Sequence, residues 1–270
     1  MTAPAMPSTL RIGLSRGALE LKSFVREKEA VAFTLAVPIV LMLIFGTIFE
    51  GRIEGTNVDF RQYFAAGIIA SGIASTTFIS LGVGIAQERD DGTLKRLYGT
   101  PMPPAAYFVG KTASALVLSI VETVILFLLG GAMFGLRPPS TPERWFTLVW
   151  VFVAGVTVCT LLGIAVSSVP RSGRGAAAVL NVPYLVLQFI SGVFFTFNEL
   201  PSGVQQVGAF FPLKWICQGL RSALLPDTLL PVEPAHAWEH GRTALVLAAW
   251  GVAGFALCLT TFRWKRRNDG

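Results

Sequence analysis

The sequence predicts an all-α, polytopic membrane protein with six transmembrane helices, an N-terminal interfacial helix and a short external re-entrant helical segment before the last span. Three observations carry this prediction. The chain is 53% hydrophobic and only 14% charged, against about 25% charged residues in a typical soluble domain. Its apolar residues form several runs of about 20 residues, the length that crosses a bilayer as a helix. Its charged residues gather between these runs, where water or lipid headgroups can surround them.

The first part of the chain, residues 1–30, carries several basic side chains. Leu14, Ala18 and Val25 recur near helical spacing, which predicts an amphipathic helix on the cytoplasmic membrane surface. The segment does not read as a secretory signal peptide, because its basic region is long and its apolar run starts late, at Val31. We expect a single domain over residues 1–270, with spans at 31–49, 62–86, 112–135, 145–168, 176–197 and 243–262.

The distribution of charge predicts the orientation of these spans. Six spans bring both termini and two of the loops to one side, which holds 15 of the 22 Lys and Arg residues, whereas the other side holds 7. The acidic residues divide 7 and 8, with Glu122 inside a span. Because Lys and Arg concentrate on the cytoplasmic side, we expect a multi-pass protein of the cell (inner or cytoplasmic) membrane with both termini in the cytoplasm. The same bias accounts for the net charge of +6 without a nucleic-acid partner.

A charged segment, residues 87–111 (QERDDGTLKRLYGTPMPPAAYFVGK), separates the second and third spans. A charge at the bilayer centre costs at least ~2.5–3.5 kcal/mol, so this segment must protrude into water. Gly92 precedes a short helix, Thr93–Tyr98, that has Leu94 and Leu97 on one face and is ended by a glycine and several prolines. A short amphipathic helix held out between two spans indicates a docking site for a soluble partner.

The run E-R-D-D-G-T-L-K-R-L-x-x-T-P, followed by G-K at Gly110 and Lys111, resembles the cytoplasmic loop of the ABC type 2 permease family. That family includes the membrane subunits of daunorubicin-type drug exporters and of polysaccharide exporters. The resemblance implies two copies of a separate ABC ATPase subunit, a second permease that is identical or similar, and surrounding membrane lipid. It also implies that ATP and Mg²⁺ bind to the ATPase subunit, with no cofactor on this chain.

In the family this loop carries a coupling helix that docks into the ATPase subunit. We therefore expect Glu88 and Arg89 to make charge-assisted contacts with that subunit, and Leu94 to insert into one of its grooves. The coupling residues that the resemblance implies are Glu88, Arg89, Asp91, Gly92, Thr93, Leu94, Lys95, Arg96 and Leu97.

The segment between the fifth and sixth spans is too apolar for an ordinary loop, and its pieces of about 10 residues are too short to span a bilayer. It is expected to form an external helical hairpin at 199–225, in the place where the family has a pair of short external helices. Trp215 departs from the small polar or basic residue usual in the family. The residues that match the family's pattern are Pro201, Pro212, Leu213 and Arg221.

Glu122 lies 11 residues beyond Lys111, about 16 Å along a helix and hence near the middle of the bilayer. An ionisable side chain at that depth faces a cavity or a partner rather than lipid. The sequence leaves open whether Glu122 lines a translocation path, acts as a protonatable switch, or packs as a neutral hydrogen-bonded carboxyl. The candidate path-lining residues are Glu122, Gln188, Phe194, Phe195 and Phe197.

Two other patterns partly resemble a nucleotide-binding loop and a metal site, but neither has the residues that such a site needs. Ala105–Thr112 fits a relaxed phosphate-loop pattern, but bulky residues fill it and prolines precede it, so we expect no nucleotide there. His236 and His240 stand beside Glu239 without an evident further ligand, so we expect no metal site. No nucleophile–base pair or carboxylate pair indicates an enzyme.

We therefore expect the permease subunit of an ATP-driven exporter that moves a hydrophobic, drug-like or lipid-like substrate out across the cytoplasmic membrane. The aromatic, mostly uncharged spans favour such a substrate. A polysaccharide or glycolipid export permease is the alternative, and a membrane-embedded enzyme or an ion channel fits the residues less well. The sequence identifies neither the substrate nor the ATPase partner, nor whether the second permease is identical.

Overall fold

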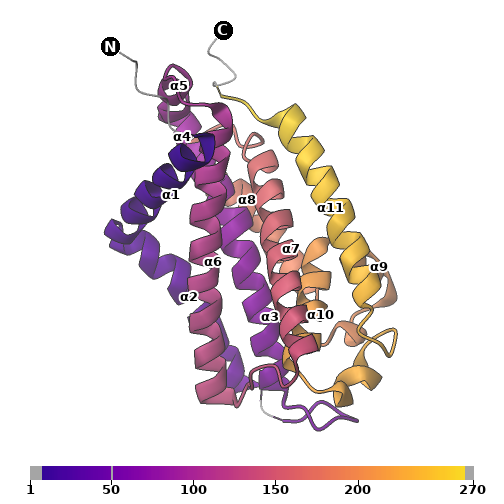
Figure 1. The fold of residues 1–270 in the computed structure, drawn as a ribbon. Helices are drawn as coiled ribbons and strands as arrows, with labels where there is room; N and C mark the ends of the chain where they lie inside the picture. Colours follow the sequence, from indigo (N-terminus) through magenta and orange to yellow (C-terminus); the bar gives the residue numbers. More distant parts are fainter. Residues whose placement is uncertain (1–7, 50, 265–270) are drawn as a thin grey trace.

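The computed structural model describes residues 8–49 and 51–264, and this part of the chain is a bundle of α-helices (Figure 1). Within it the only extended pairing is a single bridge between Arg52 and Asp59, so the predicted all-α fold class is confirmed. The helices are α1 (Thr9–Arg26), α2 (Lys28–Ile48), α3 (Phe60–Ala74), the π-helix η1 (Ser75–Ser80), α4 (Leu81–Asp90), α5 (Thr93–Tyr98), α6 (Pro104–Phe134), α7 (Pro142–Val166), α8 (Gly173–Ile190), the 3₁₀-helix η2 (Phe197–Glu199), α9 (Ser202–Phe210), α10 (Pro212–Leu224), the 3₁₀-helix η3 (Asp227–Val232) and α11 (His240–Thr261).

Four helices in the described residues are long and apolar enough to cross a membrane: Phe60–Asp90, Pro104–Phe134, Pro142–Val166 and His240–Thr261. The first of them is α3, η1 and α4 in succession. Two further helices lie where spans were predicted. The apolar part of α2, Thr34–Ile48, is shorter than these four, and α8 has 18 residues, about 27 Å of helix against a hydrocarbon core of about 30 Å. The count of six spans stays a prediction.

Helix boundaries follow local signals where the sequence supplies them. Pro104 is the first residue of α6, a position where a missing N–H costs nothing, so this helix starts eight residues before the predicted span at 112. At the start of α7, the Thr141 hydroxyl accepts a hydrogen bond from the Arg144 N–H at 3.3 Å. At the start of α8, the Ser172 hydroxyl accepts one from the Gly175 N–H at 3.2 Å, as N-cap residues do.

The helix predicted at 176–197 ends early, at Ile190. Gly192 follows with φ of 71°, in the left-handed region that glycine enters without steric cost. The chain then turns back toward the bundle, so that Phe194 and Phe197 lie in the segment after the helix and are buried. A continuous apolar run was interpreted as one helix, although a glycine turn divides it.

The centre of the bundle is the α3–η1 part of the second span. Nearly all of α3 is buried, and its many small residues allow neighbouring helices to approach closely. The π-helix η1 lies against Gly163 of α7, where an added Cβ would come within 2.8 Å of the carbonyl oxygens of Thr77 and Phe78. A glycine is therefore required at that contact.

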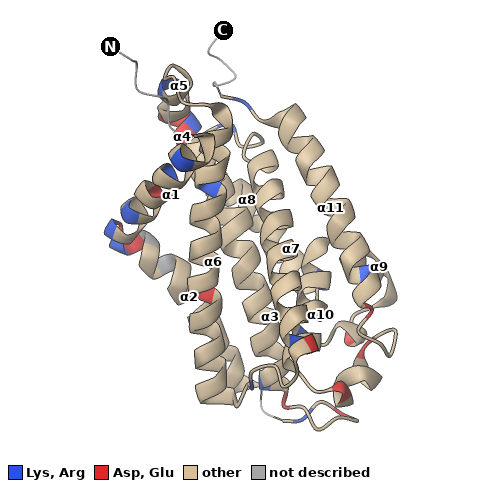
Figure 2. Ribbon diagram, in the orientation of Figure 1, with Lys and Arg blue, Asp and Glu red and all other residues tan. Residues whose placement is uncertain are grey.

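The bundle has two polar ends. In Figure 1, α5, the start of α1 and the end of α11 lie at one end, and α9 and η3 lie toward the other. Figure 2 shows the charged residues gathered at both ends, with Lys and Arg most numerous around α1, α4 and α5. This arrangement agrees with the charge asymmetry in the sequence.

Candidate functional site

The predicted helix at 93–98 is present as α5, Thr93–Tyr98, at the basic end of the bundle. Gly92 precedes it with φ of 79°, a left-handed conformation that favours glycine. The Asp91 carboxylate accepts a hydrogen bond from the Thr93 N–H at 2.8 Å and so caps the first turn. Leu94 has no exposed surface and belongs to an apolar cluster with Leu81, Ile85, Tyr107, Ala115 and Ile164.

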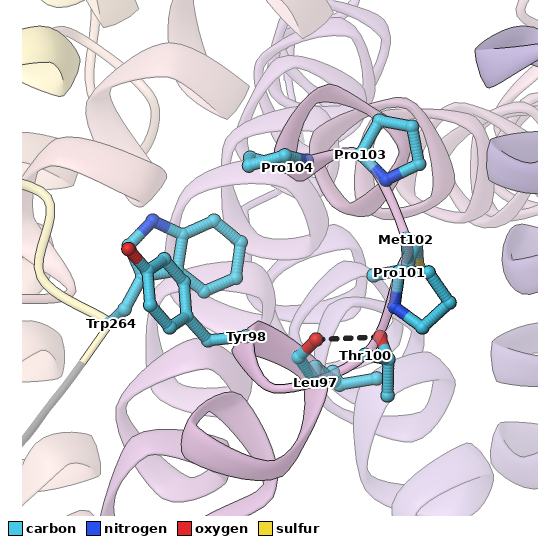
Figure 3. A pocket seen from close by; sticks show the side chains of 8 residues that line it. All are labelled: Leu97, Tyr98, Thr100, Pro101, Met102, Pro103, Pro104 and Trp264. Atoms are coloured by element: carbon cyan, nitrogen blue, oxygen red, sulfur yellow. Dashed lines mark hydrogen bonds between the residues drawn. The ribbon is translucent and has the colours of Figure 1, made fainter.

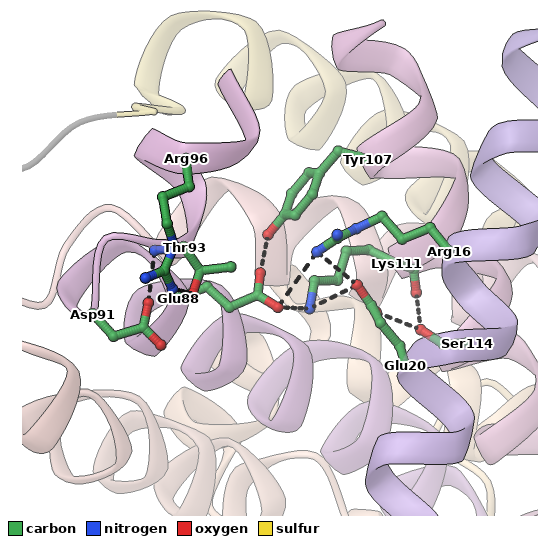
Figure 4. A network of polar contacts seen from close by, with 9 residues as sticks. All are labelled: Arg16, Glu20, Glu88, Asp91, Thr93, Arg96, Tyr107, Lys111 and Ser114. Atoms are coloured by element: carbon green, nitrogen blue, oxygen red, sulfur yellow. Dashed lines mark hydrogen bonds and ion pairs between the residues drawn. The ribbon is translucent and has the colours of Figure 1, made fainter. Parts of the chain in front are cut away.

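Glu88, at the end of α4, joins three helices (Figure 4). Its carboxylate accepts hydrogen bonds from the Tyr107 hydroxyl at 2.7 Å and from the Lys111 ammonium at 2.8 Å, both on α6. Arg16 of α1 lies 3.7 Å from the same carboxylate. Glu20 of α1 completes the network, 3.2 Å from both Arg16 and Lys111. Charge-assisted contacts of this kind reinforce one another when partly buried, so α1, α4 and α6 are held together beside α5.

Arg89, the next residue, joins a different set of elements. Its guanidinium donates to the Ser167 carbonyl at 2.6 Å, to the Ser167 hydroxyl at 3.1 Å and to the Ser168 hydroxyl at 3.4 Å, all at the end of α7. Its Nε donates to the carbonyl of Arg263 at 2.9 Å, just after α11. Five fixed donors make arginine suited to such a junction, and here the junction ties α4 to α7 and α11.

These contacts differ from the expectation for three of the predicted coupling residues. Glu88, Arg89 and Leu94 were expected to contact a partner subunit, but in the structure their side chains are engaged within the chain. These contacts position α5, and a direct contact of the same residues with an ATPase subunit stays a prediction. The outer surface of the loop includes Asp91, Lys95, Arg96 and Tyr98, which are exposed, whereas Gly92, Thr93 and Leu97 are half-buried.

Only part of the Glu88 network could be predicted from sequence patterns. Lys111 was named as part of the Gly110-Lys111 match, whereas in the structure its side chain is 10% exposed and paired with two carboxylates. Arg16 and Glu20 have i, i+4 spacing on α1, which indicates a pair on one helix face. Nothing in that spacing indicates that the pair meets α6.

Glu122 of α6 lies inside the chain, with 2% of its surface exposed. The Thr76 hydroxyl of η1 donates a hydrogen bond to one of its carboxylate oxygens. The other oxygen faces Gly72 of α3, where an added Cβ would stand 2.9 Å away, and it has no hydrogen-bond partner among the described residues. Glu122 is thus packed between two spans of one chain.

The other candidate path-lining residues are also mostly enclosed. Gln188 accepts a hydrogen bond from the Ser71 hydroxyl at 3.1 Å, and the Tyr184 hydroxyl donates to the Ser71 carbonyl at 2.6 Å. Phe194 lies within an aromatic group, 5.5 Å from the Phe45 ring and 4.8 Å from the Phe189 ring. Among the five candidates, all within the described residues, only Phe195 exceeds one third exposure, at 37%.

The external hairpin predicted at 199–225 contains α9 and α10. Pro201 precedes α9, and Pro212 is the first residue of α10. Every residue of α10 is buried, so this helix packs inside the bundle, against α3, α7 and α11. Arg221 of α10 lies with its guanidinium 3.5 Å from the centre of the Tyr63 ring. It donates to the Gly192 carbonyl and, at 3.4 Å, to the Tyr63 carbonyl.

Four further polar residues in or near α10 were not predicted as a group: Lys214, Gln218, Glu233 and Glu239. Lys214 is 5% exposed, donates to Gln218 and lies 3.9 Å from Glu239. Burial lowers the pKa of Lys214 to about 8. Burial also raises the pKa of Glu233, and the positive charges of Arg221 and Lys214 reduce this rise. The signal was present in the sequence, since Lys214, Gln218 and Arg221 follow i, i+4, i+7 spacing among apolar residues.

The patterns that suggested nucleotide or metal chemistry have other structures. Ala105–Thr112 is helical, within α6, so its backbone N–H groups are not arranged as a phosphate loop. His240 forms a hydrogen bond with the Ser222 hydroxyl at 2.9 Å. In residues 8–49 and 51–264, no group of three or more His, Cys, Asp or Glu side chains is placed to hold a metal ion.

Comparison with known proteins gives several similar permeases. The chain is 22% identical over 197 residues to the putative transport permease YvfS of Bacillus subtilis, covering 72% of this chain and 77% of that protein. It is 22% identical over 229 residues to the probable doxorubicin resistance ABC transporter permease protein DrrC of Mycobacterium tuberculosis, covering 82% and 80%. The probable multidrug ABC transporter permease YbhR of Escherichia coli is 22% identical over 204 residues, covering 74% of this chain and about half (53%) of YbhR.

The family model described as ABC-2 type transporter matches residues 17–225. That match runs from within α1 through the end of α10, and so includes α5, the Glu88 network apart from Arg16, and the buried helix α10. It extends over most of the bundle and is not confined to one motif. The chain therefore belongs to the ABC-2 type transporter family, which comprises membrane permease subunits of ABC transporters.

Proposed function

We propose that this chain is the permease subunit of an ATP-driven exporter, with α5 as the helix that an ABC ATPase subunit contacts. The observation that carries the proposal is the way α5 is held. A six-residue helix is too short to be stable alone, yet α5 is fixed on the bundle through Leu94, with Glu88 and Arg89 anchoring the residues before it. A helix anchored on one face and exposed on the other is suited to transmit a displacement from a soluble subunit to the spans.

We further propose that the substrate is hydrophobic, drug-like or lipid-like. Relatives named for multidrug and doxorubicin resistance support this class. The described interior of the bundle is also mainly apolar, and many of its polar side chains are hydrogen-bonded to one another. A path-lining role for Glu122, Gln188, Phe194, Phe195 and Phe197 would require a rearrangement or a second permease that opens these positions, because four of the five are buried here.

The proposed assembly contains two permeases, identical or similar, and two ATPase subunits that bind ATP and Mg²⁺. We place it in the cytoplasmic membrane with α1, α5 and both termini on the cytoplasmic side. The concentration of Lys and Arg around α1, α4 and α5 supports this orientation (Figure 2). The roles of Asp91, Gly92, Thr93, Lys95, Arg96 and Leu97 at the contact with the ATPase subunit belong to the same proposal.

The proposal is tested by reconstituting the chain in lipid vesicles with the ABC ATPase subunit that co-purifies with it. We expect ATP-dependent movement of a hydrophobic fluorescent dye and dye-stimulated ATP hydrolysis. Both should be lost in vesicles that hold either subunit alone. If a glycolipid or an oligosaccharide stimulated ATP hydrolysis and the dyes did not, the proposed substrate class would be wrong. The absence of any ATP-dependent transport would contradict the exporter function.

The orientation is tested with single cysteines, after the native Cys159, Cys217 and Cys258 have been replaced. Ser8, Ser140 and Ser172 are exposed in the structure, so the side of the membrane alone should decide whether an introduced thiol reacts. We expect Ser8→Cys and Ser172→Cys to be protected from a membrane-impermeant thiol reagent in intact cells, and Ser140→Cys to be labelled. Labelling at Ser172→Cys in intact cells would contradict the proposed arrangement.

A further inference from the structure

The three residues after α11 cross the end of the bundle to α5. At the end of α11, the Thr261 hydroxyl donates to the Ala165 carbonyl of α7 at 3.1 Å. The next residues, 262–264, which we call the strap, bring two aromatic side chains, Phe262 and Trp264, to the apolar cluster that holds Leu94.

Trp264 is the centre of the aromatic contacts in the strap. Its ring centroid lies 5.7 Å from that of Tyr98 on α5, and 5.5 Å and 6.0 Å from those of Tyr107 and Phe108 on α6. Phe262 packs edge-to-face on Phe108, with centroids 4.8 Å apart. These separations are within the range in which aromatic pairs attract. One side chain therefore contacts both α5 and the start of α6.

The main chain of the strap is fixed as well. Arg89 donates its Nε to the Arg263 carbonyl at 2.9 Å, while the rest of its guanidinium holds the end of α7. The Arg89 guanidinium also lies 5.9 Å from the centre of the Phe262 ring, within the distance at which a cation and an aromatic face attract. The strap is thus attached from both sides, through Arg89 on α4 and through the rings on α5 and α6.

A groove lies beside α5, and Trp264 is one of the residues that line it (Figure 3). The groove has a volume of about 340 Å³, so side chains do not fill the space between the end of α5 and the connection to α6. The Tyr98 and Trp264 rings adjoin at one side of it. The groove is lined by Leu97, Tyr98, Thr100, Pro101, Met102, Pro103, Pro104 and Trp264.

We propose that the strap makes α5 and α11 move as one unit, with Trp264 as the positioning residue, so that the last span takes part directly in coupling to ATP hydrolysis. This inference rests on the proposed function of α5. Displacement of α5 would pass through Trp264 to α11. The displacement would then pass from α11 to α9, toward the opposite end of the bundle. The contact that links these two helices is the hydrogen bond that Trp250 of α11 donates to the Phe210 carbonyl at the end of α9, at 2.7 Å. Chains of packed side chains and hydrogen bonds of this kind carry coupling between distant sites.

The test compares Trp264→Ala with Trp264→Phe in the reconstituted complex of this chain and its ATPase subunit. The measured quantity is dye transported per ATP hydrolysed, at equal insertion and with the affinity for the ATPase subunit measured separately. We expect Trp264→Ala to lower this ratio about fivefold, with unchanged affinity for the ATPase subunit. Trp264→Phe keeps an aromatic ring and is expected to retain most of the original ratio. Trp145→Ala is the matched control, since Trp145 lies in the first turn of α7, at the opposite end of the bundle, and is 48% exposed.

A cross-link tests the same inference without relying on loss of function. With the native cysteines replaced, Tyr98→Cys and Trp264→Cys are joined by a short bifunctional thiol reagent, and the joined protein is expected to keep at least half of the transport of the same variant before cross-linking. Abolition of transport by the cross-link would overturn the proposal, because it would show that α5 and α11 must separate. An unchanged ratio in Trp264→Ala, or loss of ATPase binding in that variant, would also overturn it. Failure of the exporter function itself would appear instead as absence of transport by the unmodified complex.

Discussion

Replacing Leu94 by Asp is expected to lower substrate transport per ATP hydrolysed by about tenfold or more, equivalent to ~1.4 kcal/mol in coupling, while the chain stays inserted in the membrane. Leu94 is fully buried and is the contact through which α5 packs on Leu81, Ile85 and Tyr107. Burial of a leucine contributes about 1.5–3 kcal/mol, and an unpaired carboxylate in its place costs several kcal/mol more. A six-residue helix cannot compensate for that loss, so α5 is expected to detach locally without unfolding the spans.

Two further substitutions separate this mechanism from a general effect of charge or of side-chain shape. Leu94→Met conserves volume and is expected to cost less than about 1.5 kcal/mol, with nearly normal coupling. Val169→Asp introduces the same carboxylate in the loop after α7, at a side chain that is 63% exposed, and is expected to be silent. For each variant, the number of dye molecules transported per ATP hydrolysed is measured in reconstituted vesicles with a hydrophobic dye. Normal coupling in Leu94→Asp would show that α5 is not held through this side chain.

The α5 region shows which features of the site could be predicted from the sequence. The bounds of α5 were predicted because they depend on local signals, namely Gly92 before the helix and Gly99 with several prolines after it. The direction in which Leu94 points depends on residues from Leu81 to Ile164 that are distant in sequence. A short helix with one apolar face fits a partner groove as well as its own bundle, and the pattern alone does not distinguish the two.

The spans show a similar division. Hydropathy and length located the long helices, because lipid contact constrains every residue along them. At 191–197 the same criteria wrongly extended the helix, because the apolar run continues although Gly192 turns the chain. Hydropathy reflects burial and carries no information on backbone direction. For α10, apolarity indicated a segment at the membrane. The polar positions of α10 are partnered by Tyr63, Gly192 and Glu239, which no local pattern connects to them.

The second large effect is expected at Arg221, which is 2% exposed. Arg221→Ala removes the donor to the Gly192 carbonyl and the cation over the Tyr63 ring, and it leaves the buried Glu233 without its principal opposite charge. Removal of one partner from a buried ionic network costs about 3–5 kcal/mol. At about 2–4 °C per kcal/mol for a chain of this size, we expect Tm to fall by about 10 °C.

Tm is measured in detergent with a thiol-reactive fluorescent dye. Cys159 and Cys217 are 4% and 0% exposed in the folded chain, so they react with the dye when the chain unfolds. Arg242→Ala is the matched control: its side chain is 66% exposed and pairs with Glu239 at 3.0 Å, so about 0–1 kcal/mol is expected. Arg221→Lys keeps the charge but lacks the planar set of donors that reaches two carbonyls, and is expected to fall between the two. Equal Tm values for Arg221→Ala and Arg242→Ala would show that the network around α10 does not stabilise the fold. The predicted order follows from burial, since Arg221 is 2% exposed and the Arg242 side chain is 66% exposed.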